Sequence, residues 1–319
     1  MPLDRALPAG AAEHLSEDEL YYAERARAAN TRRGYRSDLA DFSAWCQAQR
    51  FQPVPAEPAT VSAYLIWLAR HEAKVSTISR RLSSIAYAHR FAGFANPVDH
   101  PRVSVVWEGI RRQHAAEVDQ APPLMPPQLW DVTAALPPGL AGARDRALLL
   151  VGFVAALRRS ELAGVCVEHL AAHPKGQVLN IPRSKTDQHG EGQLVVLPYA
   201  TRPEHCPVLA LGDWLAAANI SIGPVFRPVH RNGITIRPNA MAEAAINRAV
   251  QRACTRALGT IIPYSAHSLR AGFATYAAQR GASDRAIAHQ TRHRSLASLD
   301  AYIRVENAWA DNAATTLDL

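Results

Sequence analysis

The sequence predicts a mainly α-helical protein with a small antiparallel β-sheet, in which an all-helical first domain precedes a mixed α+β second domain. Three observations predict this class. Helical periodicity runs through the first third of the chain without a strand-like segment. A polar and then proline-rich stretch follows, and its lack of periodicity is typical of a linker. Beyond it, two short strand-like runs flank a polar, glycine-containing turn, which predicts a β-hairpin among further helices.

These patterns divide the chain into parts. An acidic tail with the start of the first helix is expected at 1–22, a helical domain at 23–113, a linker at 114–127 and the second domain at 128–319. A chain of 319 residues is long enough for two domains of ordinary size, each with its own core.

The helices of the first domain are predicted from caps and apolar stripes. Ser16 and Glu19 have the spacing of a capping box, so a helix is expected to begin there. The next helix is expected from about Thr31, with a stripe formed by Tyr35, Leu39, Phe42 and Cys46. The segment "PATVSAYLIWLARHE" is amphipathic, because its apolar positions recur at helical spacing: Val61, Tyr64, Leu65 and Leu68. A further helix is predicted from a cap at Ser76 to a stop at Gly93, and "RVSVVWEGIRRQH" predicts a shorter one.

In the second domain, helices are expected at about 128–136 and 143–157, before the hairpin in "GQVLNIPRSKTDQHGEGQLVVLPY". The pattern then predicts helices at about 207–218, 239–257, 266–280, 283–291, 296–303 and 306–317. The last of these carries an apolar stripe of Val305, Trp309, Ala313, Thr316 and Leu317. A terminal amphipathic helix usually packs on its own domain.

Composition and charge narrow the class of function. The net charge is +7 with a pI of about 9.5, and both expected domains are basic, which favours a polyanionic partner. The longest apolar run, residues 147–157, is too short to span a bilayer. No signal peptide is visible, and the scattered Cys46, Cys166, Cys206 and Cys254 suggest neither a zinc site nor disulfides. A soluble, cytoplasmic protein without a membrane partner is expected.

Two places in the second domain combine basic and acidic side chains near predicted helix ends. In "AALRRSEL", Arg158 ends an apolar helix and Glu161 follows three residues later. The simple alternative is that Arg158 only interacts favourably with the negative, C-terminal end of the helix dipole. In "AHSLRAGFATYAAQRG", His267 and Arg270 lie one turn apart on one helix face, opposite an apolar face of Leu269, Phe273 and Tyr276. The apolar side is expected to form the core and to leave the histidine and the arginine pointing elsewhere.

Two further places carry a lysine, a histidine and a tyrosine. Lys185 lies at the tip of the predicted hairpin, where a lysine usually guards a sheet edge. In "HQTRHRSLASLDAYIRV", His293 precedes Tyr302 by nine residues, and a helical tyrosine alone is most often a core residue. His289 and His293 have a spacing that suits a metal ion, but no third ligand follows, so no metal site is expected.

Together these side chains suit phosphoryl chemistry without a metal. The set lacks the clustered carboxylates that hold Mg²⁺. Guanidinium groups match the non-bridging oxygens of a phosphate and stabilise a pentacoordinate transition state. Tyrosine has an ordinary pKa of about 10 and attacks at neutral pH only when neighbours help to remove its proton. A lysine on a hairpin is suited to donate a proton to a departing sugar oxygen.

The segments "ALRRSEL", "RSKT", "HSLRAGFAT" and "RHRSLASLDAYIR", in this order, resemble the tyrosine recombinase (phage integrase) family. The segment "SAWCQAQRFQPVPAEPATVSAYLIWLA" is similar to the helical, SAM-like core-binding domain of Cre-like and Xer-like recombinases. The resemblance implies that Tyr302 is the nucleophile and Lys185 the general acid. It also implies the remaining catalytic set: Arg158 with its acidic companion Glu161, the pair His267 and Arg270, and His293.

The resemblance implies cleavage of a DNA phosphodiester through a 3′-phosphotyrosine linkage, with release of a 5′-hydroxyl and no cofactor, ATP or metal. It implies strand exchange in a homotetramer on double-stranded DNA with inverted half-sites, linked through the 306–317 helix. Two positions depart from the family pattern. Arg292 stands where glycine is frequent, so a changed turn or an added phosphate contact is expected, and Ala271 stands where many members have histidine.

In the first domain the family geometry implies phosphate contacts from two groups of arginines: Arg25, Arg27, Arg32, Arg33 and Arg36, and then Arg80, Arg81 and Arg90. A solvated helix face is the simple alternative for each. Two other functions remain open at this stage. A type IB topoisomerase uses the same chemistry, and a DNA-binding protein with a vestigial catalytic set has the same motifs. A metal-dependent nuclease fits the residues least well.

Overall fold

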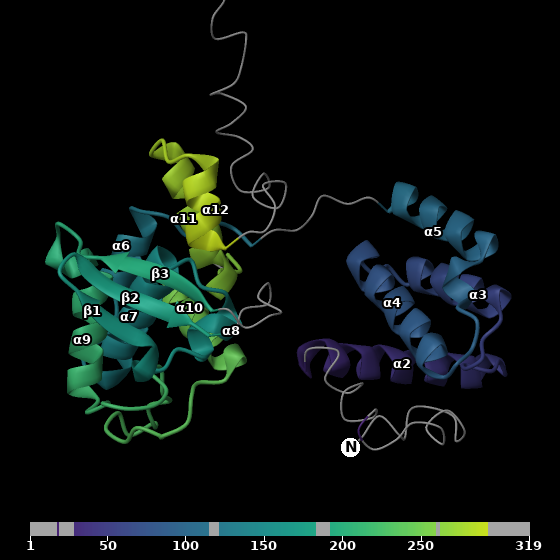
Figure 1. Ribbon diagram of the computed structural model, residues 1–319, viewed down its shortest axis with the longest axis horizontal. Helices are drawn as coiled ribbons and strands as arrows, with labels where there is room; N and C mark the ends of the chain where they lie inside the picture. The colour runs from purple at the N-terminus through teal and green to yellow at the C-terminus, as the bar shows by residue number, and fades with distance from the viewer. Residues whose placement is uncertain (1–17, 19–28, 115–120, 183–191, 260–261, 293–319) are drawn as a thin grey trace, which may run out of the picture. The chain divides into compact units, whose positions relative to one another are not determined.

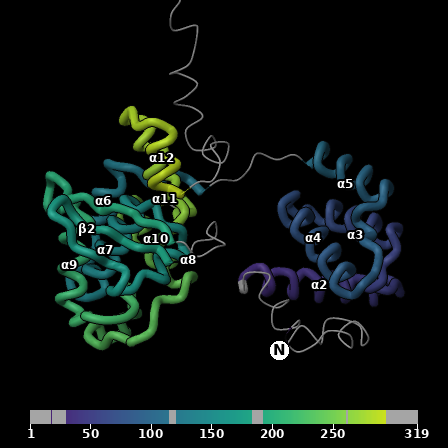
Figure 2. The backbone as a smooth tube through the Cα atoms, in the orientation of Figure 1, coloured from purple at the N-terminus to yellow at the C-terminus, as the bar shows by residue number. Residues whose placement is uncertain are grey.

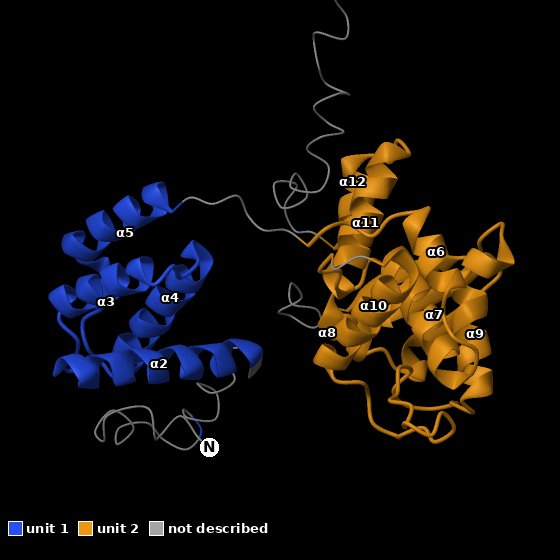
Figure 3. Cartoon of the chain, turned by 180° about the vertical axis from the view of Figure 1, so that it is seen from behind, with its two compact units in different colours: residues 1–119 blue, residues 120–319 orange. Residues whose placement is uncertain are grey.

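The computed structural model describes Asp18 and residues 29–114, 121–182, 192–259 and 262–292. The chain forms two compact units, residues 1–119 and 120–319, which Figure 3 shows in separate colours. Both are mainly helical, and the second contains a small antiparallel sheet, so the predicted fold class is confirmed (Figure 1).

The first unit is built from helices that pack in pairs. They are α2 (Ala29–Gln49), α3 (Pro58–Arg70), α4 (Val75–Phe91) and α5 (Pro101–Gln113), with the short 3₁₀ helix η2 (Pro97–Asp99) before α5. Helix α2 packs on α4, and α3 packs on α5. Proline opens both α3 and α5, where its missing N–H would have no helical partner. All four predicted apolar positions of α3 are buried in the core of this unit.

One detail of the first unit differs from the sequence prediction. Helix α4 begins at Val75 after Lys74, so Ser76 lies inside the helix and does not cap it. Tyr35 is only partly buried, and its ring contacts Tyr87 of α4 at a centroid distance of 5.5 Å. The capping box predicted at Ser16 lies outside the described residues.

The helices of the second unit surround one buried helix, α7 (Leu140–Val154). The others are α6 (Gln128–Ala134), α8 (Arg159–Ala163), α9 (Pro207–Ala217), α10 (Glu243–Leu258), α11 (Ala266–Gln279) and α12 (Asp284–Thr291). Helix α7 carries an unbroken buried run, residues 147–153, and packs against α9 and α11. Figure 2 shows α11 and α12, which also pack together, at one end of the unit. The helices expected at 296–303 and 306–317 lie outside the described residues.

The described strands form one antiparallel sheet in the order β1 (Leu170–His173), β2 (Gly176–Ile181) and β3 (Gln193–Pro198). Strands β2 and β3 are the predicted hairpin, whereas β1 was not predicted. In β3, Val195 and Leu197 are buried in the core that contains α7, while Leu194 and Val196 are exposed. This alternation identifies one covered and one open face of the sheet.

The proline-rich end of the predicted linker belongs to the second unit. Leu124 is fully buried in its core, and the Leu124 N–H donates to the Ser268 carbonyl at 2.9 Å. A Cβ on Gly272 would lie 2.0 Å from the Leu124 carbonyl oxygen, so only glycine permits this approach of α11. None of the described helices has both the length and the apolar character needed to cross a membrane.

Candidate catalytic site

The site is organised around the end of α7, where the helix stops earlier than the sequence predicts. Helix α7 ends at Val154, and Ala156 adopts a left-handed conformation with φ of +47°. The Leu157 N–H donates to the Gly152 carbonyl, and the Ala156 N–H donates to the Phe153 carbonyl. These two bonds form a Schellman motif. The turn leaves the carbonyls of Ala155 and Ala156 outside the helical hydrogen-bond ladder, available to other donors.

Arg158 and Glu161 form the next part of the site. Arg158 is the residue before α8, and its backbone N–H donates to Glu161 Oε2 at 2.8 Å. Its guanidinium Nη1 donates to Glu161 Oε1 at 2.7 Å. Arg158 therefore does not sit at the dipole of α7, because it begins a new helix and is fixed there by its acidic companion.

Arg270 lies in the interior, contrary to the expected division of α11 into an apolar core face and a free polar face. The residue is 1% exposed, and its Nη1 donates to the Ala156 carbonyl at 2.8 Å. Helix α11 is deeply buried, since Ser268, Leu269 and Ala271 are also in the interior. Arg270 thus contacts the turn after α7, the same turn that leads into Arg158.

His267 lies one turn before Arg270 and is exposed. Ser265 caps the helix here, accepting a hydrogen bond from the His267 N–H. Although the residue reaches solvent, partial loss of hydration lowers the pKa of His267, and the guanidiniums of Arg270 and Arg158 lower it further. The imidazole is therefore mainly neutral at pH 7 and able to accept a proton.

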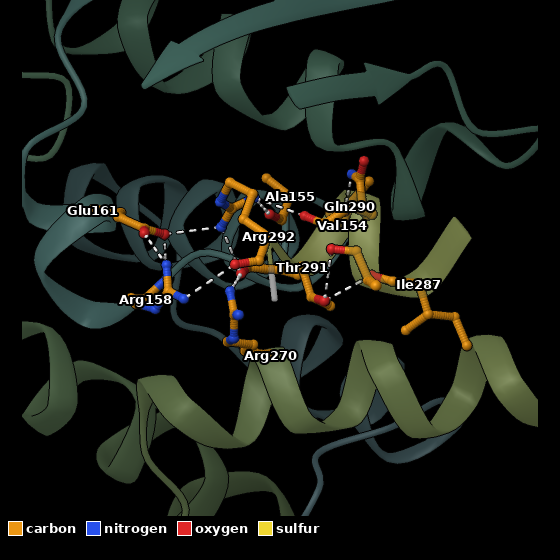
Figure 4. A network of polar contacts seen from close by, with 11 residues as sticks. Val154, Ala155, Arg158, Glu161, Arg270, Ile287, Gln290, Thr291 and Arg292 are labelled. Atoms are coloured by element: carbon orange, nitrogen blue, oxygen red, sulfur yellow. Dashed lines mark hydrogen bonds and ion pairs between the residues drawn. The ribbon is translucent and has the colours of Figure 1, made fainter. Parts of the chain in front are cut away.

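Arg292 completes the network and corrects the expectation of a phosphate contact. Its side chain is 3% exposed, and Nη2 donates to Glu161 Oε2 at 2.8 Å. The same guanidinium donates to the carbonyls of Ala155 at 3.0 Å and Ala156 at 2.9 Å. Figure 4 shows Arg292 pointing toward Glu161, with Arg158 and Arg270 beside it. The guanidinium is therefore committed to the interior.

The network gives Glu161 a stable negative charge. Burial alone would raise the pKa of Glu161, but the Arg292 guanidinium, the Arg158 N–H and the Arg158 guanidinium together hold it below its usual value. Because one carboxylate faces two arginines, with Arg270 close by, the site keeps an excess of positive charge. Such an excess favours a phosphate group.

Three predicted site residues lie outside the described part of the chain: Lys185, His293 and Tyr302. Lys185 falls between β2 and β3, and His293 directly follows Arg292 in the sequence. Among the described residues, no group of three or more His, Cys, Asp or Glu side chains could hold a metal ion. The structure thus brings together Arg158, Glu161, His267 and Arg270 of the predicted set.

The arginines predicted to contact DNA differ in their exposure and in their ion pairs. Arg33, Arg36 and Arg90 are exposed, and Arg32 is partly buried. Arg80 forms an ion pair with the buried Asp38 at 3.0 Å. Arg81 forms an ion pair with Asp41, donates to Tyr64 Oη at 2.6 Å and is 18% exposed, so an internal role explains it better. Arg25 and Arg27 lie outside the described residues.

The sequence of the second unit matches the phage integrase family over residues 127–308, more than half of the chain. The chain belongs to the phage integrase family. Residues 18–94 match the N-terminal SAM-like domain of phage integrases. An integrase/recombinase xerD homolog of Selenomonas ruminantium is 36% identical to this integrase-family chain over 305 residues, which cover 94% of this chain and 89% of that protein. The recombinase cre of Escherichia phage P1 is 25% identical over 264 residues, covering 76% and 74%.

Solved structures show the same fold for this family member. The XerH site-specific recombinase, in a post-cleavage complex with a palindromic difH substrate, has a TM-score of 0.66 at 15% identity and covers 95% of this chain and 84% of its own. A lambda integrase dimer bound to a COC′ core site has a TM-score of 0.54 at 15% identity, covering 94% and 93%. At these identities the likeness concerns the fold alone.

Sequence reasoning missed two contributors to the site. It assigned no role to the carbonyls of Ala155 and Ala156, since nothing in "FVAALRRSEL" marks a left-handed alanine. It noted Arg292 as a departure but did not pair it with Glu161. The sequence signal that could have marked Arg292 was a long cationic side chain at the end of a predicted helix, where glycine is favoured.

Proposed function

We propose that this chain is a site-specific DNA recombinase that cleaves and rejoins DNA through a 3′-phosphotyrosine intermediate. The observation that carries the proposal is the convergence of Arg158 and Arg270 on the turn after α7, beside Glu161 and His267. Arg158 Nη2 approaches the Arg292 carbonyl at 3.4 Å, so the segment that leads to His293 and Tyr302 begins at this cluster. The matches to recombinases and to DNA-bound neighbours support the same proposal.

In this mechanism each group has one task. Tyr302 attacks the scissile phosphorus, and its phenolic proton leaves with help from the neutral His267. The guanidiniums of Arg158 and Arg270 bind the non-bridging oxygens and stabilise the charge of the pentacoordinate transition state. Lys185 donates a proton to the departing 5′ oxygen, and His293 assists at the phosphate. The phosphotyrosine bond forms as the phosphodiester breaks, and attack by a 5′-hydroxyl reverses the step without ATP.

Two protomers are proposed to bind inverted half-sites of double-stranded DNA, and two such dimers to form the tetramer that exchanges strands. The helix expected at 306–317 is proposed to dock on a neighbouring subunit. Removing residues 306–319 is then expected to leave half-site binding intact and to weaken cooperativity between half-sites. Titration of one and two half-sites in a gel-mobility assay measures both quantities, and unchanged cooperativity would remove the helix from the assembly.

Phosphate contacts from the first unit are proposed for the exposed arginines of α2 and α4. Counterion release makes the affinity fall with salt at a log–log slope of roughly −0.9 for each neutralised phosphate. Arg36→Ala and Arg90→Ala are each expected to make the slope less steep by about 0.9. Fluorescence anisotropy across a salt series measures it. The exposed Arg50 lies outside the proposed contacts, so Arg50→Ala is the matched control and should keep the wild-type slope.

The experiment that tests the proposed function is recombination of a plasmid with two copies of a binding site selected from random DNA. The proposal predicts deletion or inversion products that depend on both sites. Relaxation of a plasmid without any site would instead favour a topoisomerase. Binding with neither product nor covalent adduct would identify a DNA-binding protein with a vestigial catalytic set.

A further inference from the structure

We propose that Arg292 is a positioning residue of this site: it fixes the Glu161 carboxylate, and through it Arg158, and joins the end of α12 to the turn after α7. The inference rests on the proposed function, because it assigns the cluster around Glu161 to catalysis. It goes beyond that function in giving a task to a side chain that touches neither phosphate nor nucleophile.

The backbone of Arg292 is the first reason. Helix α12 ends at Thr291, and Arg292 takes up a left-handed conformation with φ of +57°. That conformation favours glycine and disfavours any residue with a Cβ atom. A buried arginine at such a position is retained at a conformational cost, so its side-chain contacts must compensate for it.

Those contacts reach across the whole site. The guanidinium binds Glu161 Oε2 and the carbonyls of Ala155, Ala156 and Gln290. Gln290 adds a second tie, since its amide donates to the Val154 carbonyl at 2.8 Å. The end of α12 is therefore held against the end of α7 by side chains from two adjacent positions.

The arrangement around Glu161 shows how Arg292 acts on Arg158. Glu161 Oε1 accepts from the Arg158 guanidinium, while Oε2 accepts from the Arg158 N–H and from Arg292. In return, Arg158 Nη2 approaches the backbone carbonyl of Arg292 at 3.4 Å. The side chain of Arg292 thus binds Glu161, and its backbone carbonyl accepts from Arg158. Without the Arg292 guanidinium, Oε2 would keep only the Arg158 N–H, and the carboxylate would be held from the Arg158 side alone.

The charges around Glu161 predict a pH signature. The groups that hold its charge are Arg158 and Arg292. On α11, His267 interacts electrostatically with Arg270 and Arg158, and on α10 Glu243 is paired with Arg159. Removing Arg292 deletes the largest charge that favours the ionised carboxylate, so Glu161 becomes protonated at a higher pH. A protonated Glu161 holds Arg158 less firmly, and cleavage falls as the pH is lowered through that value.

The test compares wild type, Arg292→Gly and Arg292→Lys in single-turnover cleavage of a nicked DNA site between pH 4.5 and 8. Arg292→Gly suits the left-handed backbone and is expected to slow cleavage on the order of 100-fold, as a misplaced group does. Its acid limb should move to higher pH, because the Arg292 charge no longer favours the ionised Glu161, while DNA affinity stays within a few-fold. Arg292→Lys keeps the charge without the fork of donors and should restore the acid limb and part of the rate.

Two controls separate positioning from general destabilisation. Arg144→Ala removes another buried, ion-paired arginine of the same unit, so it should lower the melting temperature without moving the acid limb. In the double variant Arg292→Gly/Glu161→Gln the shift should disappear and leave only the acid limb of His267, because glutamine does not titrate. An acid limb unchanged in Arg292→Gly, or moved equally by Arg144→Ala, would overturn the proposal.

Thermal unfolding gives a readout that does not depend on cleavage. Glu161 has a lowered pKa in the folded state, so its stabilisation is present above the unfolded pKa of about 4.3 and is lost as the pH falls through the folded value. The melting-temperature difference between wild type and Arg292→Gly should therefore be largest above about pH 5 and shrink below it. A difference independent of pH would contradict the pairing. Absence of a covalent adduct in wild type would instead contradict the proposed function.

Discussion

Replacing Arg270 by alanine is expected to reduce DNA cleavage by about 10²- to 10³-fold while DNA binding changes little. Arg270 is fully buried, and its Nη1 is held by the Ala156 carbonyl. A guanidinium fixed in this way needs no reorganisation when negative charge develops on the phosphate, which is where preorganised donors contribute most. Affinity depends mainly on phosphate contacts elsewhere, so it should stay within a few-fold.

The loss of cleavage should exceed what destabilisation explains. The Ala156 carbonyl also accepts a hydrogen bond from Arg292, so Arg270→Ala leaves that acceptor with a partner. Arg270→Lys preserves the charge but not the planar fork, and it should remain far slower than wild type. Single-turnover cleavage and gel-mobility titration measure the two effects. Arg252→Ala, at an exposed position of α10, is the control. Cleavage by Arg270→Ala within about threefold of wild type would exclude a transition-state role.

The fold was largely predictable because its patterns are local. Helical spacing located α3 and α4, and alternation located the β2–β3 hairpin, since each needs only neighbouring residues. Strand β1 was missed because its four residues, "LAAH", carry no alternation of their own and are placed by pairing with β2. Leu124 was assigned to a linker because only the tertiary contact with α11 shows that it belongs to a core.

The sequence named the described residues of the candidate site, but it did not predict the hydrogen bonds and ion pairs that join them. Motif spacing identified Arg158, Glu161, His267 and Arg270 together. Their contacts depend on where α7 ends, and the left-handed Ala156 gave no sequence signal. The amphipathic reading of α11 was wrong for Arg270, because an arginine can be buried when carbonyls and carboxylates receive its donors. For the same reason the side chain of Arg292, at a position where a changed turn or a phosphate contact was expected, is paired with Glu161 in the interior.

Loss of the tyrosine hydroxyl is expected to have the largest effect of any single change. Tyr302→Phe removes the atom that forms the covalent bond and keeps the ring, so packing is little altered. Covalent chemistry cannot proceed without its nucleophile, and a loss on the order of 10⁴-fold or more is expected. Binding to DNA should be unchanged. Tyr276→Phe, at a partly buried position of α11 in the same unit, also removes one tyrosine hydroxyl and serves as the matched control.

Covalent trapping on a nicked site, with EDTA present, tests the central claim most directly. Wild type and Tyr276→Phe are expected to give a denaturant-resistant protein–DNA band, and Tyr302→Phe to give none at equal DNA occupancy. Peptide mapping of the wild-type band should find the 3′-phosphate on Tyr302. Binding by wild type without any covalent band, or a band that persists in Tyr302→Phe, would contradict tyrosine-based recombination in this protein.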